Sequence, residues 1–299
     1  PDTSCAVHKE KNFDLNPAQL YFMLDESGSM DGWKWTEATD AIDATVSQMT
    51  YDTKDDVVQF GLGWFSGSAE TKVAPKEDSY SEISSALSHS PSGGTRMDEG
   101  LANAKPTLAG EPDASSRPQA TMLITDGYPN SGSEQLTVDA ACAHRLDAPV
   151  YVVGFGSGTY QEFNDLVAAA GGTGYCCKDG VSCTESGTSN HTDPCASGEY
   201  PIDSEGNVKS NWECHGSRQV SGGSGLQTVA TEVANKLACQ IDVSQNDLWQ
   251  KSYSDSGYGC AANNYSCLKI DWGGTLGTLA YAPGDPDGTG WRWSDSNTQ

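Results

Sequence analysis

The feature that most constrains the fold of this chain is a short apolar run that stops abruptly at polar residues. Residues 20–24 read Leu-Tyr-Phe-Met-Leu and lead at once into Asp25-Glu26-Ser27-Gly28-Ser29. An unbroken apolar run of this length, bounded by turn-forming residues, is typical of a strand buried on both faces in a parallel sheet. Apolar runs at 56–65 and 120–125 predict two more strands of the same kind.

The segments between these strands repeat apolar residues at helical spacing. Trp35, Ala38, Ile42 and Val46 stand three or four positions apart, which predicts an amphipathic helix over 33–49. Strands that alternate with helices indicate an α/β fold, with a doubly wound, mostly parallel sheet and helices on both faces. The same criteria predict helices over 79–87, 97–108, 133–146, 159–170 and 225–238, and strands at 70–74, 150–155 and 171–176.

The polar residues that follow the first strand are suitable ligands for a hard cation. Asp25, Ser27 and Ser29 supply a carboxylate and hydroxyls, and Mg²⁺ prefers such oxygen ligands in octahedral geometry. This triplet cannot complete a site alone, so later loops must contribute. Thr95 follows a glycine turn, and Asp126 directly follows another predicted strand. Asp25 and Asp126 both lie just past strand ends, where ligands bind in such sheets, and Thr95 offers a further hydroxyl just before a predicted helix.

The motifs Asp-x-Ser-Gly-Ser, Gly-Gly-Thr and Thr-Asp-Gly occur in this order, each in its expected strand or loop context. Together they resemble the metal-ion-dependent adhesion site of von Willebrand factor A domains and integrin I domains; a lone Asp-x-Ser-x-Ser would be a common turn. The resemblance covers residues 19–240 and implies a Rossmann-like sheet. It also implies a bound Mg²⁺, or alternatively Mn²⁺ or Ca²⁺, whose coordination is completed by an acidic side chain of a protein partner. The implied metal-site residues are Asp25, Ser27, Ser29, Thr95 and Asp126.

The chain departs from that family between its last predicted strand and its last predicted helix. Residues 178–223 are rich in Gly, Ser and Cys and form an insertion in the domain over 19–240. A loop this long is normally functional or cross-linked. We expect the insertion at the metal-bearing edge, either as part of the ligand-binding surface or as a disulfide-braced decoration. Residues 1–18 are predicted to form an N-terminal arm, and residues 241–299 a small β-rich extension.

The cysteines favour an oxidising compartment. Their number is even, 10, and no pair shows the Cys-x-x-Cys spacing of zinc or redox sites, so we expect disulfides in a secreted or cell-surface protein. Cys260 and Cys267 are the best candidate pair across a short loop. Cys176 and Cys177 are expected to bond to different partners, because neighbouring side chains of a strand point to opposite faces.

Charge and hydropathy exclude other classes of protein. The formal net charge of −24 argues against nucleic acid as a partner. No apolar run approaches the roughly 18 residues of a membrane-spanning helix. Nothing at Pro1 resembles a signal peptide, which favours a mature, processed chain.

The rim of the expected metal site is acidic, and Arg96 is the only nearby cation in sequence. The favoured ligand is therefore a partner that offers a single carboxylate in basic surroundings; alternatively, the rim carboxylates simply face solvent. The rim carboxylates are Glu26, Asp31, Asp98 and Glu99.

Enzymatic activity is not expected. The sequence has no Gly-x-Ser-x-Gly elbow, no His-Glu-x-x-His and no phosphate-binding loop. Metal-assisted phosphoryl chemistry would need a basic phosphate clamp, which we do not find. The stronger alternative to adhesion is a structural subunit of a secreted or cell-surface filament or pilus-type assembly, able to self-assemble, in which the metal stabilises loops.

Overall fold

The computed structural model describes residues 17–52, 58–111, 114, 117–156, 160–180, 183–185, 190–197, 199 and 201–238, and the backbone of three later strands. The chain divides into two compact units. One is Leu15–Ile241, and the other combines Pro1–Asp14 with Asp242–Gln299. The predicted limits at residues 18 and 240 lie at the margins of the described part and stay predictions.

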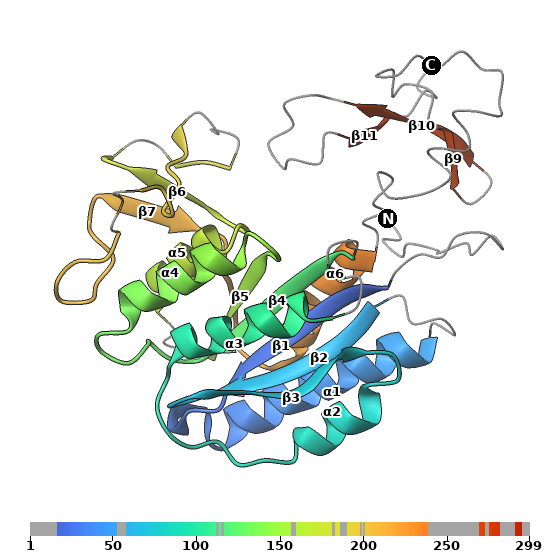
Figure 1. Ribbon diagram of the computed structural model, residues 1–299, viewed down its shortest axis with the longest axis horizontal. Helices are drawn as coiled ribbons and strands as arrows, with labels where there is room; N and C mark the ends of the chain where they lie inside the picture. Colours follow the sequence, from blue (N-terminus) through green and yellow to red (C-terminus); the bar gives the residue numbers. More distant parts are fainter. Residues whose placement is uncertain are drawn as a thin grey trace. The chain divides into compact units, whose positions relative to one another are not determined.

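The larger unit is built on a six-stranded sheet of spatial order β3-β2-β1-β4-β5-β8 (Figure 1). Its edge strand β3 runs antiparallel to β2, and the other neighbours are parallel. The three apolar runs read from the sequence form the central strands, every residue of which is buried. The strands are β1 (Ala18–Asp25), β2 (Val58–Phe65), β3 (Ala69–Lys76), β4 (Gln119–Thr125), β5 (Val150–Phe155) and β8 (Arg218–Val220).

Helices cover both faces of this sheet, as the sequence predicts. Alternate residues of β1 point to opposite faces. Phe22 packs in a core with α1, α2 and α6, whereas Met23 packs in a second core with α3, α4 and α5. The helices are α1 (Trp33–Asp52), α2 (Tyr80–Ala86), α3 (Met97–Ala109), α4 (Glu134–His144), α5 (Gln161–Ala170) and α6 (Gly223–Ala238), and a 3-10 turn, η1, spans Gly28–Met30. The predicted doubly wound α/β fold is thereby confirmed.

The predicted last strand of the main sheet, over 171–176, is wrong. Strand β6 (Tyr175–Lys178) leaves the sheet and pairs antiparallel with β7 (Trp212–His215) in a separate two-stranded sheet. A disulfide between Cys176 and Cys214 joins these two strands. The free edge of β5 is instead covered by β8, a strand that lies inside the insertion, and Val153 is paired with Arg218.

Disulfides fasten the insertion to itself and to the sheet domain. Cys142 on α4 is bonded to Cys195, and Cys177 to Cys183. Because Cys176 is bonded to Cys214, the prediction that neighbouring Cys176 and Cys177 have different partners is confirmed. The predicted pair of Cys260 and Cys267 lies outside the described residues.

The smaller unit contains a three-stranded antiparallel sheet of order β11-β10-β9. Its strands are β9 (Lys269–Trp272), β10 (Thr275–Tyr281) and β11 (Trp291–Ser294). They agree with the prediction of a β-rich extension. Among the described residues of the chain, no helix combines the length and the apolar character that crossing a membrane requires.

Candidate metal centre

The five residues predicted as metal ligands come together at the carboxyl ends of β1 and β4. Asp25 is the last residue of β1, and Asp126 directly follows β4. The parallel register pairs Leu24 with Ile124, so the two strands end side by side. Ser27 and Ser29 follow Asp25 in the turn around η1, and Thr95 precedes α3.

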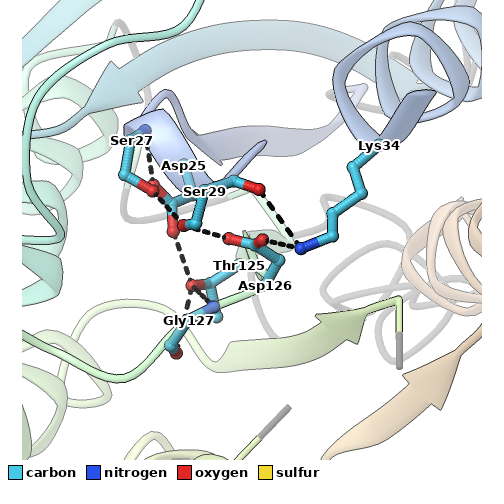
Figure 2. Close-up of polar contacts among 7 residues, drawn as sticks. All are labelled: Asp25, Ser27, Ser29, Lys34, Thr125, Asp126 and Gly127. Carbon is cyan, nitrogen blue, oxygen red and sulfur yellow. Dashed lines mark hydrogen bonds and ion pairs between the residues drawn. The ribbon is translucent and has the colours of Figure 1, made fainter. Parts of the chain in front are cut away.

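A continuous chain of hydrogen bonds links the serine loop to the loop after β4. The hydroxyl oxygens of Ser27 and Ser29 lie 2.9 Å apart. Ser29 Oγ donates to Asp126 Oδ1 at 2.8 Å, a contact between residues 97 positions apart in sequence (Figure 2). The hydroxyls and carboxylate that the motif predicts as ligands therefore lie within one small volume.

Asp25 is a fully buried carboxylate beneath these hydroxyls. It accepts hydrogen bonds from Ser27 N at 2.8 Å and from Thr125 Oγ1 at 2.7 Å. Neither of these two donors carries a positive charge. Burial, with a smaller contribution from the nearby charge of Asp126, raises the pKa of Asp25 to about 7 despite these two donors. A carboxylate buried in this way is stabilised by a neighbouring cation, which the site has the oxygen ligands to hold.

Thr95 is held against the same site by Asn130. Thr95 N donates to Asn130 Oδ1 at 3.0 Å, and Asn130 N donates to Thr95 O at 2.9 Å. Gly94 is needed beside this pair, because a Cβ there would lie 2.6 Å from Asn130 Nδ2. A Cβ on Gly127 would lie 3.6 Å from Thr95 Oγ1 and 3.7 Å from Ser29 Oγ. The two hydroxyls therefore border the same space, which a larger side chain at position 127 would enter.

The structure adds Lys34, which the sequence analysis missed. Its ammonium group forms an ion pair with Asp126 Oδ2 and donates to the backbone oxygen of Ser29 at 3.2 Å (Figure 2). The Lys34 side chain is 23% exposed, and that of Asp126 is 1% exposed. Arg96 is thus not the only cation near the expected metal site. The position of Lys34 at the start of the helix that follows the Asp-x-Ser-Gly-Ser motif was the sequence feature from which this contact could have been predicted.

The acidic rim is largely paired. Glu26 lies 3.1 Å from His89 Nε2 and accepts from Ser66 Oγ at 3.1 Å. Arg96 binds Asp98 through two nitrogens, at 2.8 and 2.6 Å. It also donates to Glu99 at 3.0 Å, so the partners of these carboxylates lie within the chain itself. The rim is consequently less repulsive toward an acidic ligand than its sequence indicates.

The donor set fits a hard divalent cation. Hydroxyl and carboxylate oxygens are ligands that Mg²⁺ and Mn²⁺ accept, and the set contains no sulfur or imidazole. Among the described residues, no group of three or more His, Cys, Asp and Glu side chains is arranged to hold a metal. A cation at this place would therefore depend on the serine and threonine hydroxyls, with Asp25 and Asp126 as the acidic members.

Comparison with known families identifies the class of the domain. The von Willebrand factor type A domain profile matches residues 19–180, more than half of the chain. The chain therefore belongs to the von Willebrand factor type A domain family. No curated protein sequence matches it.

Solved structures of low sequence identity align with this chain, and the one with a TM-score above 0.5 shares its fold. The pilus adhesin SpaC from Lactobacillus rhamnosus GG, in its open conformation, aligns with a TM-score of 0.52 and 12% identity over 76% of this chain. This chain matches only 30% of that adhesin's length. The conserved hypothetical protein BatB from Bacteroides thetaiotaomicron has a TM-score of 0.46 and 20% identity, over 75% of this chain and all (100%) of BatB. Proximal thread matrix protein 1 from the mussel byssus has a TM-score of 0.47 and 14% identity, over 75% of this chain and 47% of its own.

Proposed function

We propose that this chain is an extracellular adhesion protein that binds a divalent cation, with Mg²⁺ as the best candidate, and uses it to capture an acidic side chain of a protein partner. The observation that carries the proposal is the hydrogen-bonded convergence of oxygens from loops that are remote in sequence, from Ser27 through Ser29 to Asp126. The proposed ligand residues are Asp25, Ser27, Ser29, Thr95 and Asp126.

Each residue has a distinct part in this proposal. Ser27, Ser29 and Thr95 offer neutral hydroxyl oxygens, and the buried Asp25 orients the serine loop through its bond from Ser27 N. Asp126 is already shared between Ser29 and Lys34. With so few negative charges on the site, a bound cation keeps enough positive character to attract a carboxylate from outside. A charge-assisted contact of this kind anchors an otherwise polar interface.

Binding rather than catalysis is the function that these residues support. Two of the histidines within the described part pack against other side chains: His144 is buried against Thr121, and His89 stacks on Trp64 with ring centroids 4.2 Å apart. An extracellular location accords with the disulfides of the insertion. A fold that a pilus adhesin also uses is compatible with adhesion and with the alternative of a filament or pilus subunit.

Paramagnetic relaxation tests the proposal directly. The protein is loaded with Mn²⁺, and the relaxation of the ¹³C-labelled side-chain carboxylate of N-acetyl-aspartate methylamide is measured. Strong enhancement is expected, because the carboxylate approaches the ion, with little enhancement for the asparagine analogue. Ser29→Ala and Thr95→Val should abolish the effect while leaving the fold intact. Asp40→Ala, which removes an exposed carboxylate on α1, is the matched control.

The same experiment separates adhesion from the structural alternative. If the metal only stabilises loops, Mg²⁺ raises the unfolding temperature but the aspartate probe is relaxed no more than its asparagine analogue. That outcome would favour the filament or pilus subunit. If neither Mg²⁺ nor Mn²⁺ binds, the hypothesis of metal-dependent adhesion and the hypothesis of a metal that stabilises loops both fail.

A further inference from the structure

A cleft opens between the first turn of α5, Tyr128 in the loop after β4, and strand β7 of the insertion. Its volume is about 570 Å³. Tyr128 follows Asp126 by two positions, so one loop contributes to both places. The Tyr128 hydroxyl donates a hydrogen bond to the backbone oxygen of Gly206, which joins that loop to the insertion. The cleft therefore combines the sheet domain with the segment in which this chain departs from its family.

Aromatic rings form much of the cleft wall. The ring of Tyr128 lies 4.6 Å from that of Tyr160 and 5.0 Å from that of Phe163, at interplanar angles of 59° and 56°. Trp212 also lines the cleft, but it is only 7% exposed and Lys178 Nζ lies 5.6 Å from its ring centroid, so the accessible ring is that of Tyr160. Tyr160 is 54% exposed, so its ring is accessible to a ligand. The faces of such rings attract cations, and the planar guanidinium group of arginine stacks on them best.

The charged side chains of the cleft are mainly acidic. Glu162, Asp165 and Glu213 line it, and the described lining residues include neither lysine nor arginine. Asp165 already accepts hydrogen bonds from the N–H and hydroxyl of Ser217, at 2.8 and 2.7 Å. Glu213 lies 3.2 Å from His215 Nε2, a contact that neutralises it only when the imidazole is protonated. Glu162 and Glu213 are exposed and thus remain the accessible carboxylates.

The start of α5 does not reverse this preference. A helix N-terminus carries a partial positive charge of about half an elementary charge, which favours anions. Glu162 lies in that first turn and offsets the partial charge. Two further carboxylates and the net charge of −24 leave the cleft suited to a cation rather than an anion.

We propose that this cleft binds a basic side chain, arginine in preference to lysine, of the protein partner. The assignment to the same partner rests on the proposed function. In that case, the partner's carboxylate binds at the metal next to Asp126, and its guanidinium group binds in the cleft next to Tyr128, two positions further along the same loop. The insertion is in this view part of the ligand-binding surface, one of the two roles open from the sequence. The partner presents a basic and an acidic residue close together.

The cleft can be tested without metal and without the natural partner. The isotope-labelled full chain is titrated in EDTA with N-acetyl-arginine methylamide and, separately, with the citrulline analogue, which has nearly the same shape but no charge. NMR shifts are followed at the Trp212 indole and at the amides of Gln161, Glu162 and Glu213. We expect arginine to bind about fivefold more tightly than citrulline, the scale of a partly exposed cation–π contact with carboxylate support.

Paired variants locate the effect. The double variant Glu162→Gln with Glu213→Gln should weaken arginine binding about fivefold, whereas Glu82→Gln with Asp139→Asn should leave it unchanged, although both remove two exposed carboxylates. Equal shifts with arginine and citrulline would overturn the proposal. So would stronger shifts of the same signals by a neutral sugar such as methyl α-mannoside, which would mark a carbohydrate site. Because EDTA is present throughout, failure of the metal proposal leaves this result unaffected.

Discussion

The sheet body and the cysteine-rich insertion are held together by different means. In the body, long apolar strands are buried on both faces: Phe22 packs in the core on one face of the sheet, and Met23 packs in the core on the other. In the insertion, β7 has four residues and β8 has three, and β6, which leads into it, has four. Disulfides provide its cross-links, one of which reaches α4 through Cys142. Hydrophobic burial thus holds the body together, whereas the insertion combines disulfides with a few residues, such as Ile202 and Trp212, that pack in the second core.

This difference bears on function, because the two candidate binding places depend on different regions. The metal centre lies at the carboxyl ends of β1 and β4, and the register of these buried strands fixes the relative positions of its residues. The cleft needs both regions, since Trp212 and Glu213 come from the insertion while Tyr160 belongs to the body. In the two proposals, the sheet body supplies the metal centre, and the insertion completes the cleft.

The largest expected effect is the loss of core packing in the body. Phe22→Ala should lower the free energy of unfolding by about 3–5 kcal/mol, because Phe22 is 0% exposed and stacks on Phe60 with ring centroids 5.9 Å apart. Chemical denaturation measures this loss. Leu146→Ala, at a residue that is 78% exposed, is the control and should cost no more than about 0.5 kcal/mol. Similar losses in both variants would contradict the view that burial defines the body.

Removing a cross-link should affect the insertion first. Cys142→Ser with Cys195→Ser should destabilise it by about 2–4 kcal/mol, because the bond closes a loop of sequence separation 53. Limited proteolysis should then cut within 178–223 while the body survives. Mg²⁺ affinity should stay near that of the wild type, since neither cysteine adjoins the metal centre. If cleavage begins in the body instead, the two regions are not separable.

The sequence predicted the body well because its signals are local. Apolar runs and helical spacing identify buried strands and amphipathic helices, and Asp25 and Asp126 could be placed at strand ends from these patterns alone. The predicted fold class is confirmed, and the proposed ligands lie together. Whether they bind metal stays a prediction.

The sequence failed where long-range pairing decides the outcome. The sequence predicts a last sheet strand over 171–176, yet the strand that forms, 175–178, pairs with 212–215, and residues 218–220 occupy the sheet edge instead. Strands this short carry little hydrophobic pattern, and a disulfide partner cannot be read from spacing. Lys34 was missed for a similar reason, because its contact with Asp126 spans 92 positions.

Acid should destabilise the body through His144. Burial, together with a smaller effect of the Lys105 charge, lowers the pKa of His144 from 6.5 to about 4. The unfolded chain binds this proton at higher pH than the folded chain, so the contribution of His144 to stability falls as pH decreases from about 6.5 toward 4, by up to roughly 2–3 kcal/mol. The raised pKa of Asp25 acts in the opposite direction over this range, so the effect is read from the difference between wild type and variant. Denaturation of the wild type and His144→Gln across this range measures the effect. A variant with the same pH slope as the wild type would exclude His144 as the cause.

The smallest effect concerns Lys34, which lies in the body but acts on the metal centre. Its ammonium neutralises Asp126 without a metal, so a cation that binds there meets a positive charge. Lys34→Met should therefore lower the stability of the metal-free protein by about 1 kcal/mol and tighten Mg²⁺ binding about threefold to tenfold. Lys105→Met is the control, because Lys105 pairs with Asp147, 3.1 Å away. Calorimetric titration with Mg²⁺ measures the affinity. Weaker binding in Lys34→Met would mean that Lys34 organises Asp126 for the ion rather than competing with it.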